Sequence, residues 1–343
     1  VKGGEKFHLV ATTANMGSLK GKYAITSNFP LDFHAMLLKL ESSQDIGFGY
    51  YTDSSDLQIT VDWPEEAVIE ITKKDGDTGK NLAGAVYGVY SDNACTKLIV
   101  KMPPTDSNGS SRVTLTKTQD TVYLKEITAP EGYVVQASSY GVKLVVGSTT
   151  KQTVTDKEQK GNLTVYKEGE VFVGAVSDEN GTSFQYEKRR QKGAVYNVYA
   201  AEDIVTAGGK TVYKKGAEVA KNLITGEDGS VTVKNLPLGS YNVTEAQAPE
   251  NFYNAKETKK VTISYAGQTA EAAFSETTFT NDRQKAVVQV IKKDKDTENT
   301  LSGGHFALFA AQDMKTADGK VAVKTDALIE TAITGTDGKA AFK

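Results

Sequence analysis

One segment occurs three times in this chain with its parts in the same order, and this repeat constrains the fold more than any other feature. Each copy opens with an alternating apolar stretch that carries a lysine. It then turns at a polar, Gly-containing segment and continues into a stretch rich in Val, Tyr or Phe. The opening stretches are residues 68–75, 163–167 and 288–294, and the later stretches are residues 82–90, 193–199 and 301–309. Self-similarity of this kind predicts a tandem array of like domains.

The spacing within the repeat shows where one copy differs. Lys73 and Gly84 are 11 positions apart (84 − 73), and Lys292 and Gly303 have the same separation (303 − 292). In the middle copy, the corresponding lysine and glycine are 26 positions apart (193 − 167). We therefore expect an insertion in the middle copy around residues 180–190.

The two complete copies also close alike. After an acidic turn and a further strand, they read LKEITAPEGY and VTEAQAPE, and they end in short strands; these parts are residues 124–133, 243–250, 154–156 and 279–281. The third copy stops at Lys343, soon after a turn at residues 335–338 that matches residues 226–229 of the second. We expect the third copy to be truncated before its closing strands.

Alternation of β-branched and aromatic residues with a period of two runs through most of the chain, interrupted by Gly, Asp and Pro. This pattern predicts an all-β chain built of antiparallel β-sandwich modules. With 343 residues, 39% of them hydrophobic and 24% charged, the chain is long enough for several packed cores. The predicted domains are a β-rich tail of a preceding domain at residues 1–66, a first module at 67–159, a second at 160–284 and a truncated third at 285–343.

Residues 1–66 do not match the repeat, yet they contain three strand-like stretches, at residues 6–12, 22–26 and 57–63. The joints at residues 64–66, 157–160 and 282–285 are polar and too short to act as flexible linkers. The modules are therefore expected to lie end to end.

Charge and hydropathy exclude some functions. The formal net charge of −3 gives the chain no basic field, so nucleic-acid binding through phosphate neutralisation is excluded. No run of 18 apolar residues occurs, and residues 1–30 lack a charged, apolar, cleavable leader. We therefore expect no membrane span, and we interpret the chain as an internal fragment.

Cofactor and thiol chemistry have little support in the sequence. Cys95 is the only cysteine, so it cannot form an intramolecular disulfide, and no activating base is visible near it. His8, His34 and His305 lack the spacing of metal ligands, so no metal site and no cofactor is predicted. The acidic run at residues 75–79 lacks the distal Glu of a calcium loop and is predicted to be a β-turn.

Several polar residues fall at positions that should face the core. Side chains alternate between the two faces of a strand, so Lys73 shares the apolar face with Ile69 and Ile71. The same count turns inward Glu126 and Asp156 in the first copy, Lys167, Glu245 and Asn281 in the second, and Lys292 in the third. Each complete copy thus combines an inward Lys, an inward Glu and an inward Asp or Asn.

An inward set of this kind can react. Isolated buried charges are costly, so buried ionisable groups pair, shift their pKa values or become neutral. A desolvated lysine that loses its proton is a nucleophile, and a carboxyl group with a raised pKa can pass on the proton it keeps. Water would then leave from Asp156, or ammonia from Asn281, and the product would be an amide crosslink. The alternative is a set of partly exposed ion pairs on the sheet faces.

The KxD opening, the GAVY strand, the ExxAPEGY segment and the closing TN or TD resemble the collagen-adhesin B-type repeats of Gram-positive surface adhesins and pilins. The resemblance covers residues 67–343 and implies SpaA-like, prealbumin-like sandwiches. It also implies an autocatalytic isopeptide bond between a lysine on the first strand and Asn or Asp on the last, assisted by Glu on a neighbouring strand. The residues that match are Lys73, Glu126 and Asp156 in the first module, Lys167, Glu245 and Asn281 in the second, and Lys292 alone in the third. We expect Lys292 to stay unreacted.

The middle copy departs from this pattern at two places. It has Gly169 where the first copy has Asp75, and it reads ENFY at residues 250–253 where the first copy reads EGY at residues 131–133. The sequence also contains no YPK pilin motif and no LPxTG signal. A polymerised pilin and a single-chain adhesin therefore both remain open.

The repeat and the resemblance together predict an extracellular structural stalk or shaft of a cell-wall-anchored bacterial adhesin or pilin. Its partners would be sortase-linked pilin subunits or the cell wall, with a host extracellular-matrix or glycan ligand bound by another part of the protein. The alternative is a module that itself binds a host protein or glycan, through the insertion at residues 177–191 or through residues 1–66. No enzyme activity is predicted beyond crosslinking that occurs once per molecule.

Overall fold

The computed structural model describes residues 65–342, and in this part of the chain the regular structure consists of strands, with no helix. No segment described there could therefore cross a membrane as a helix. The predicted strands at residues 6–12, 22–26 and 57–63 lie outside the described residues, as do His8, His34 and all but the last two residues of the predicted tail.

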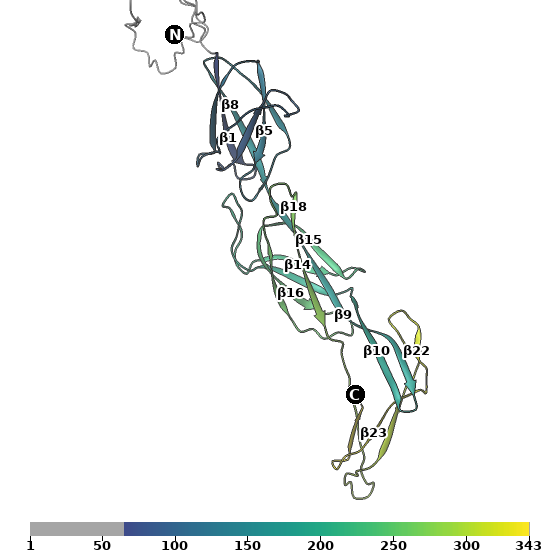
Figure 1. Ribbon diagram of the computed structural model, residues 1–343. Helices are drawn as coiled ribbons and strands as arrows, with labels where there is room; N and C mark the ends of the chain where they lie inside the picture. Colours follow the sequence, from purple (N-terminus) through teal and green to yellow (C-terminus); the bar gives the residue numbers. More distant parts are fainter. Residues whose placement is uncertain (1–64, 343) are drawn as a thin grey trace, which may run out of the picture.

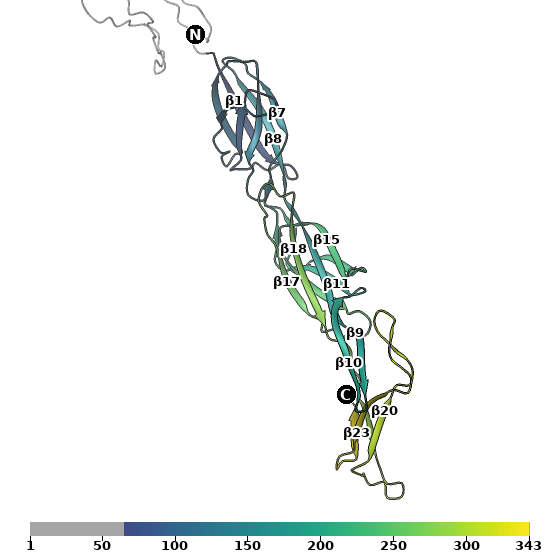
Figure 2. The same ribbon diagram turned by 45° about the vertical axis from the view of Figure 1, so that its right-hand side comes forward.

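The strands form bodies that follow one another along a rod, and the two views of the ribbon agree on this shape (Figures 1 and 2). Only Gln159 separates the last strand of the first body from the first strand of the second. The first two bodies thus follow one another without a flexible linker, as the short polar joint predicts.

The first sandwich comprises β1 to β8 in two four-stranded sheets, with strand orders β4-β1-β8-β6 and β3-β2-β5-β7. Its strands are β1 (Glu66–Asp75), β2 (Val86–Tyr90), β3 (Leu98–Lys101), β4 (Ser110–Thr116), β5 (Thr121–Thr128), β6 (Tyr133–Val134), β7 (Ser139–Lys143) and β8 (Thr149–Glu158). Ile69 and Ile71 of one sheet and Leu124 of the other are fully buried between the sheets.

The second sandwich comprises β9 to β18. One sheet has the order β10-β9-β15 with β18 also paired to β9, the other has the order β14-β11-β16-β17, and β12 and β13 form a small hairpin. Its strands are β9 (Lys160–Asp178), β10 (Gly181–Arg190), β11 (Val195–Ala200), β12 (Ile204–Val205), β13 (Thr211–Tyr213), β14 (Glu218–Ile224), β15 (Ser230–Pro237), β16 (Gly239–Gln247), β17 (Thr258–Ile263) and β18 (Ala272–Asn281). The predicted all-β sandwich architecture is confirmed.

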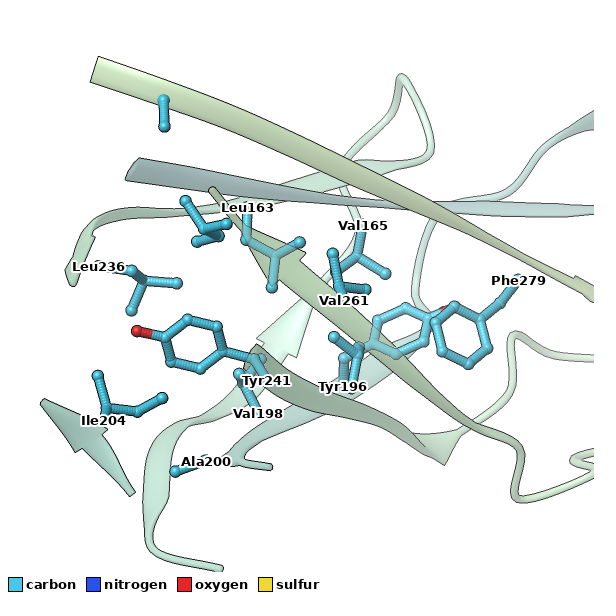
Figure 3. Packing of buried hydrophobic residues seen from close by; sticks show 14 residues of the cluster. Leu163, Val165, Tyr196, Val198, Ala200, Ile204, Leu236, Tyr241, Val261 and Phe279 are labelled. Carbon is cyan, nitrogen blue, oxygen red and sulfur yellow. The ribbon is translucent and has the colours of Figure 1, made fainter. Parts of the chain in front are cut away.

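Each sandwich has its own apolar core. Figure 3 shows that of the second sandwich, where Leu163 and Val165 of β9 face side chains of the opposite sheet. The rings of Tyr196 and Phe279 lie side by side at one end of this core, with centroids 4.9 Å apart. Burial of these large side chains, each worth about 1.5 to 3 kcal/mol, holds the two sheets together.

The first and last strands of each sandwich are neighbours and run in parallel, unlike the other pairs of the two sandwiches. β1 pairs in parallel with β8, and β9 pairs in parallel with β18. The register is the same in both, because Lys73 lies opposite Val154 and Lys167 lies opposite Phe279. Asp156 and Asn281 each follow two residues later, on the same face of the sheet.

The insertion in the middle copy is a hairpin. β9 continues beyond the sandwich to Asp178, and β10 runs back along it from Gly181 to Arg190. The hairpin reaches the third segment, where Thr182 Oγ1 donates to Leu328 O and Arg189 pairs with Asp318. The predicted insertion is thus an extension of the sheet that contacts the next segment, and not an open loop.

The third segment contains β19 to β24, joined in three two-stranded ladders: β19 with β24, β20 with β23, and β21 with β22. The strands are β19 (Val288–Ile291), β20 (His305–Phe309), β21 (Met314–Lys315), β22 (Val321–Val323), β23 (Leu328–Ile333) and β24 (Lys339–Phe342). Apart from β10, they correspond in order to β9 and β11 to β15 of the second sandwich. Val288, Ile291 and Phe309 remain exposed, so this segment has no closed core within residues 65–342.

Candidate crosslinking sites

Lys73, Glu126 and Asp156 meet inside the first sandwich. They come from β1, β5 and β8, and their side chains are buried. Lys73 Nζ donates a hydrogen bond of 2.5 Å to Asp156 Oδ1 and lies 2.8 Å from Glu126 Oε1. The side chains of all three residues are 0% exposed, so they are not the partly exposed ion pairs of the alternative interpretation.

The strand register brings these groups together although Lys73 and Asp156 are 83 positions apart in sequence. β1 and β8 are adjacent, so the side chains of Lys73 and Asp156 project from one sheet into the core, two residues out of register. Glu126 approaches from the facing sheet, on β5. The amine therefore lies between two carboxyl groups, one from each sheet.

Tyr87 completes the first site. It lies directly opposite Glu126 in the β2–β5 pairing, and Lys73 Nζ donates a hydrogen bond of 2.8 Å to its hydroxyl oxygen. Burial raises the pKa of the Tyr87 phenol, and the nearby carboxylates of Glu126 and Asp156 raise it further. The hydroxyl group therefore stays neutral, and its oxygen can accept the hydrogen bond from Lys73 Nζ.

The surroundings of Asp156 favour its protonated form. Burial raises the pKa of Asp156 to about 7, with a smaller contribution from Glu126, although Lys73 acts in the opposite direction. Its second oxygen, Oδ2, has no hydrogen-bond partner among the described residues. A neutral carboxylic acid in contact with a lysine amine is therefore accessible near neutral pH.

Lys167, Glu245 and Asn281 meet in the same way inside the second sandwich. They come from β9, β16 and β18 and are buried. Lys167 Nζ lies 2.8 Å from Glu245 Oε1, although the pair lacks the angles of an ordinary hydrogen bond. Asn281 Nδ2 donates a hydrogen bond of 2.8 Å to the other oxygen, Glu245 Oε2. Glu245 thus bridges the amine and the amide.

The surroundings of the second site favour the neutral form of its lysine. Burial lowers the pKa of Lys167, although the negative charges of Glu245 and Glu257 oppose the shift. The hydroxyl group of Tyr196, which corresponds to Tyr87, has no hydrogen-bond partner among the described residues. The two sites therefore share a lysine and a glutamate but differ in the contact made by the tyrosine.

Lys292 differs from the other two lysines. The alternation of β19 predicts that it faces a core, but its side chain is exposed. Within the described part of the chain, β19 pairs only with β24, so the strands that cover Lys73 and Lys167 have no counterpart here. The expected inward orientation of Lys292 is therefore wrong for this structure, because burial requires a facing sheet as well as the right position in the strand.

The other candidates from the sequence lie away from these sites. Cys95 lies in the turn between β2 and β3, where its thiol lies 3.7 Å from the carbonyl oxygen of Asn93. His305 is exposed on β20. Asp75 Oδ1 accepts hydrogen bonds from the backbone N–H groups of Asp77 and Thr78, which confirms the predicted turn.

Two stretches of the chain, residues 67–159 and 185–278, match the family described as "SpaA: Prealbumin-like fold domain", and together they cover more than half of the chain. The chain belongs to the SpaA prealbumin-like family. The resemblance to the collagen-adhesin B-type repeats of adhesins and pilins is thereby confirmed. The second match begins at residue 185, so the greater part of the β9–β10 hairpin lies outside the matched residues.

The search of solved structures finds the TIE protein of Bacillus anthracis and several pilins. The Bacillus anthracis TIE protein is 22% identical, with a TM-score of 0.52, over 84% of this chain and 45% of that one. A streptococcal ancillary pilin is 21% identical (TM-score 0.28, 65% of this chain and 63% of that one), and BcpA, the major pilin subunit of Bacillus cereus, is 14% identical (TM-score 0.26, 64% and 100%). The likeness to the TIE protein concerns the fold, and this chain covers 45% of that protein's length. A comparison with curated protein sequences finds no match.

In both sandwiches of this chain, the buried groups are suited to one kind of reaction. In the first sandwich, the lysine amine contacts the aspartic acid. In the second, it lies beside a glutamate that also binds the asparagine amide. The side chains of both sites are shielded from water. Low-dielectric surroundings favour the neutral amine and the neutral acid over the ion pair. Acyl transfer to the amine is the chemistry that this arrangement can support.

Sequence reasoning missed Tyr87 and Tyr196 as members of the two sites. Both stand at the end of the GAVY motif, and alternation places them inward with Ala85 and Ala194. The signal that would have identified them is the strand pairing, which sets Tyr87 opposite Glu126 and Tyr196 opposite Glu245. These strands are neighbours in the sheet but not consecutive along the chain, so the pairing cannot be predicted from the period alone.

Proposed function

We propose that this chain is part of the shaft of a bacterial surface adhesin or pilin, and that each complete sandwich closes an internal amide bond. The bonds join Lys73 to Asp156 and Lys167 to Asn281. The observation that carries the proposal is the fully buried contact between Lys73 Nζ and Asp156 Oδ1, at 2.5 Å, with Glu126 Oε1 2.8 Å from the same nitrogen.

In the first sandwich the reaction is a condensation. The neutral amine of Lys73 attacks Cγ of protonated Asp156, a C–N bond forms, and the C–O bond to Oδ2 breaks. The departing oxygen takes its own proton and one that Nζ releases, passed on by the carboxyl group of Glu126, and leaves as water. The free Oδ2 and the raised pKa of Asp156, about 7, support this route.

In the second sandwich the leaving group is ammonia. Lys167 Nζ attacks Cγ of Asn281, and the C–N bond to Nδ2 breaks as Nδ2 gains a proton. Glu245 touches both nitrogens, at 2.8 Å each, so it can take the proton from Nζ and deliver it to Nδ2. The lowered pKa of Lys167 makes the attacking amine available.

The position of the bonds fits a shaft that withstands pulling. Tension would enter the first sandwich at the start of β1 and leave at the end of β8, and these parallel strands are adjacent. A bond between Lys73 and Asp156 would carry that tension directly from β1 to β8 and bypass residues 74–155. The same holds for β9 and β18, so neither sandwich would need to unfold under load.

The bonds would also stabilise each sandwich against unfolding. Treated like a disulfide that closes a loop of this size, each bond restricts the unfolded chain and contributes about 4 to 5 kcal/mol. Unfolding and proteolysis both slow when strands cannot separate. Such a rod suits the outer surface of a bacterial cell, where it would be linked to the cell wall or to further pilin subunits and would carry a ligand-binding part elsewhere.

A single-molecule pulling experiment on the chain between Glu66 and Asn281 tests this function. The account predicts that neither sandwich lengthens before the attachment breaks. Glu126→Ala should release the length of residues 74–155. Glu245→Ala should release the length of the chain between Lys167 and Asn281. A wild-type chain that unfolds and lengthens at ordinary forces would rule out the proposed role.

A further inference from the structure

The loop between β17 and β18 of the second sandwich lies against the end of the first sandwich and is bound to it through Gln268. The side-chain Oε1 of Gln268 accepts a hydrogen bond of 2.8 Å from Ala129 N, and its Nε2 donates one of 3.2 Å to Ile127 O. The backbone oxygen of Gln268 accepts a further hydrogen bond of 2.9 Å from Val135 N. One residue of the second sandwich thus ties together two parts of the first.

These contacts surround the glutamate of the first site. Ile127 directly follows Glu126 on β5, and Val135 directly precedes Gln136, whose backbone N–H donates a hydrogen bond of 2.8 Å to Glu126 Oε2. Gln268 therefore holds the chain on both sides of the hydrogen bond that orients the Glu126 carboxyl group. The other oxygen of that group, Oε1, is the one that faces Lys73 Nζ.

The loop that carries Gln268 is itself fixed by the single residue between the sandwiches. Gln159 is buried, and its Nε2 donates hydrogen bonds of 2.9 and 2.6 Å to the carbonyl oxygens of Gly267 and Ala270. Its Oε1 accepts one of 2.7 Å from Ala266 N. Gln268 is thus presented to the first sandwich by a preorganised loop.

At the matching place of the second sandwich, the hydrogen bonds to neighbouring backbone found among the described residues come from the joint after β18, where Tyr253 N donates to Asp282 O and Gln284 N donates to Asn251 O. Its corresponding segment, residues 246–254, lines a pocket of about 530 Å³ together with Gln284. Asn254 Nδ2 binds Ala246 O within the segment itself. The second site is therefore organised within its own sandwich, whereas the first borrows contacts from its neighbour.

We propose that Gln268 is a positioning residue for the reaction between Lys73 and Asp156, so that the first bond closes rapidly only after the second sandwich has folded and docked. This inference rests on the proposed function. It assigns an order to the two reactions. The second site needs no contact from a neighbouring sandwich, whereas the first is fully organised when Gln268 fixes the segment around Glu126.

The test follows both bonds over time in the full chain made by cell-free synthesis, using the linked tryptic peptides of each site as the readout. Gln268→Ala removes both side-chain hydrogen bonds, and Gln268→Met removes them while keeping the side-chain volume. Both variants should slow the first bond by about tenfold or more and leave the rate of the second unchanged, because misplacement of a reacting group costs that much. Gln185→Ala, on the exposed face of β10, is the matched control and should change neither rate.

Gln268→Glu separates positioning from general stability. A protonated glutamate side chain can make both hydrogen bonds of glutamine, whereas the ionised form lacks the donor. The rate of the first bond in this variant, relative to wild type, should therefore recover as the pH falls from about 7 to about 4, through the ordinary pKa of a glutamate. Equal first-bond rates in wild type, Gln268→Ala and Gln268→Met, or slowing of both bonds together, would overturn the inference. A wild-type chain that closes only the second bond would instead overturn the proposed reaction of the first site, and this inference with it.

Discussion

Tyr133 donates a hydrogen bond of 2.6 Å from its hydroxyl group to Asp75 Oδ2, beside the crosslinking site of the first sandwich. In the second sandwich the corresponding residues are Phe252 and Gly169, and a Cβ atom on Gly169 would collide with the Phe252 ring. The two positions at which the middle copy differs from the first are therefore in contact in both sandwiches. In the first they hold a buried acid and its phenol partner, and in the second they hold a glycine and the aromatic ring that covers it.

Tyr133→Phe should destabilise the first sandwich by about 1 to 3 kcal/mol, because it leaves one oxygen of a buried carboxylate, Asp75 Oδ2, without its hydrogen-bond donor. The measurement is urea unfolding in a Glu126→Ala background, where the sandwich is not crosslinked. The double variant Asp75→Gly with Tyr133→Phe, which copies the second sandwich, should cost less than the sum of the single changes. Additive losses would show that the two residues act independently.

The cost of Tyr133→Phe should depend on pH. Burial alone would raise the pKa of Asp75, but hydrogen bonds from Tyr133, Thr78 and Asp77 lower it below its ordinary value. A carboxyl group with a lowered folded-state pKa stabilises the fold above its unfolded pKa of about 3.9, and this contribution is lost as the pH falls further. The difference between wild type and variant should therefore be full at neutral pH and shrink in acid; an equal difference at both would contradict this assignment.

Tyr87→Phe should slow the first bond, and Tyr196→Phe should leave the second nearly unchanged. The hydroxyl group of Tyr87 binds Lys73 Nζ at 2.8 Å, whereas that of Tyr196 has no partner among the described residues. Loss of one such hydrogen bond is worth about 1 kcal/mol, or about fivefold in rate. Time courses of the two linked peptides, measured in the same sample, provide the comparison. Equal slowing of both bonds would show that the tyrosines act through packing.

The two bonds should respond differently to alkaline pH. Burial raises the pKa of Asp156 to about 7, and the acid form needed for loss of water disappears above that value. The first bond should therefore close more slowly at about pH 9 than at about pH 6. Burial lowers the pKa of Lys167, and Asn281 needs no such protonation, so the second bond should not slow over this range.

Asp156→Asn is the control for this pH dependence. It converts the first site to the amide chemistry of the second, so the bond should still form, with loss of about 17 Da in place of about 18 Da, and without slowing in alkali. A first bond that still slows at high pH in this variant would place the titrating group elsewhere.

The sequence was sufficient to predict the sandwiches and the two buried triads. Alternation along each stretch correctly placed Lys73, Glu126 and Asp156 in a core, because one face of each strand is covered by the opposite sheet. The same rule was wrong for Lys292, which has the right position in its strand but no covering sheet within the described residues. Burial depends on neighbours that a local pattern does not specify.

Contacts between distant segments were beyond the reach of the pattern. The parallel pairing of the first and last strands, which sets Lys73 two residues out of register with Asp156, requires knowledge of the sheet order. Gln268 lies 139 positions from Ala129 and belongs to another sandwich, so no periodicity connects the two. The hairpin was predicted as an insertion, but the pattern does not show that β9 extends to pair with β10, or that Thr182 binds Leu328 of the third segment.

Intact mass of the purified chain tests the central claim most directly. Two closed bonds predict a mass about 35 Da below that calculated from the sequence, from one water of about 18 Da and one ammonia of about 17 Da. Glu126→Ala should restore the first loss and Glu245→Ala the second, each without affecting the other. A wild-type mass equal to the calculated one would contradict the account and would leave Lys73 and Lys167 as buried ion-pair partners.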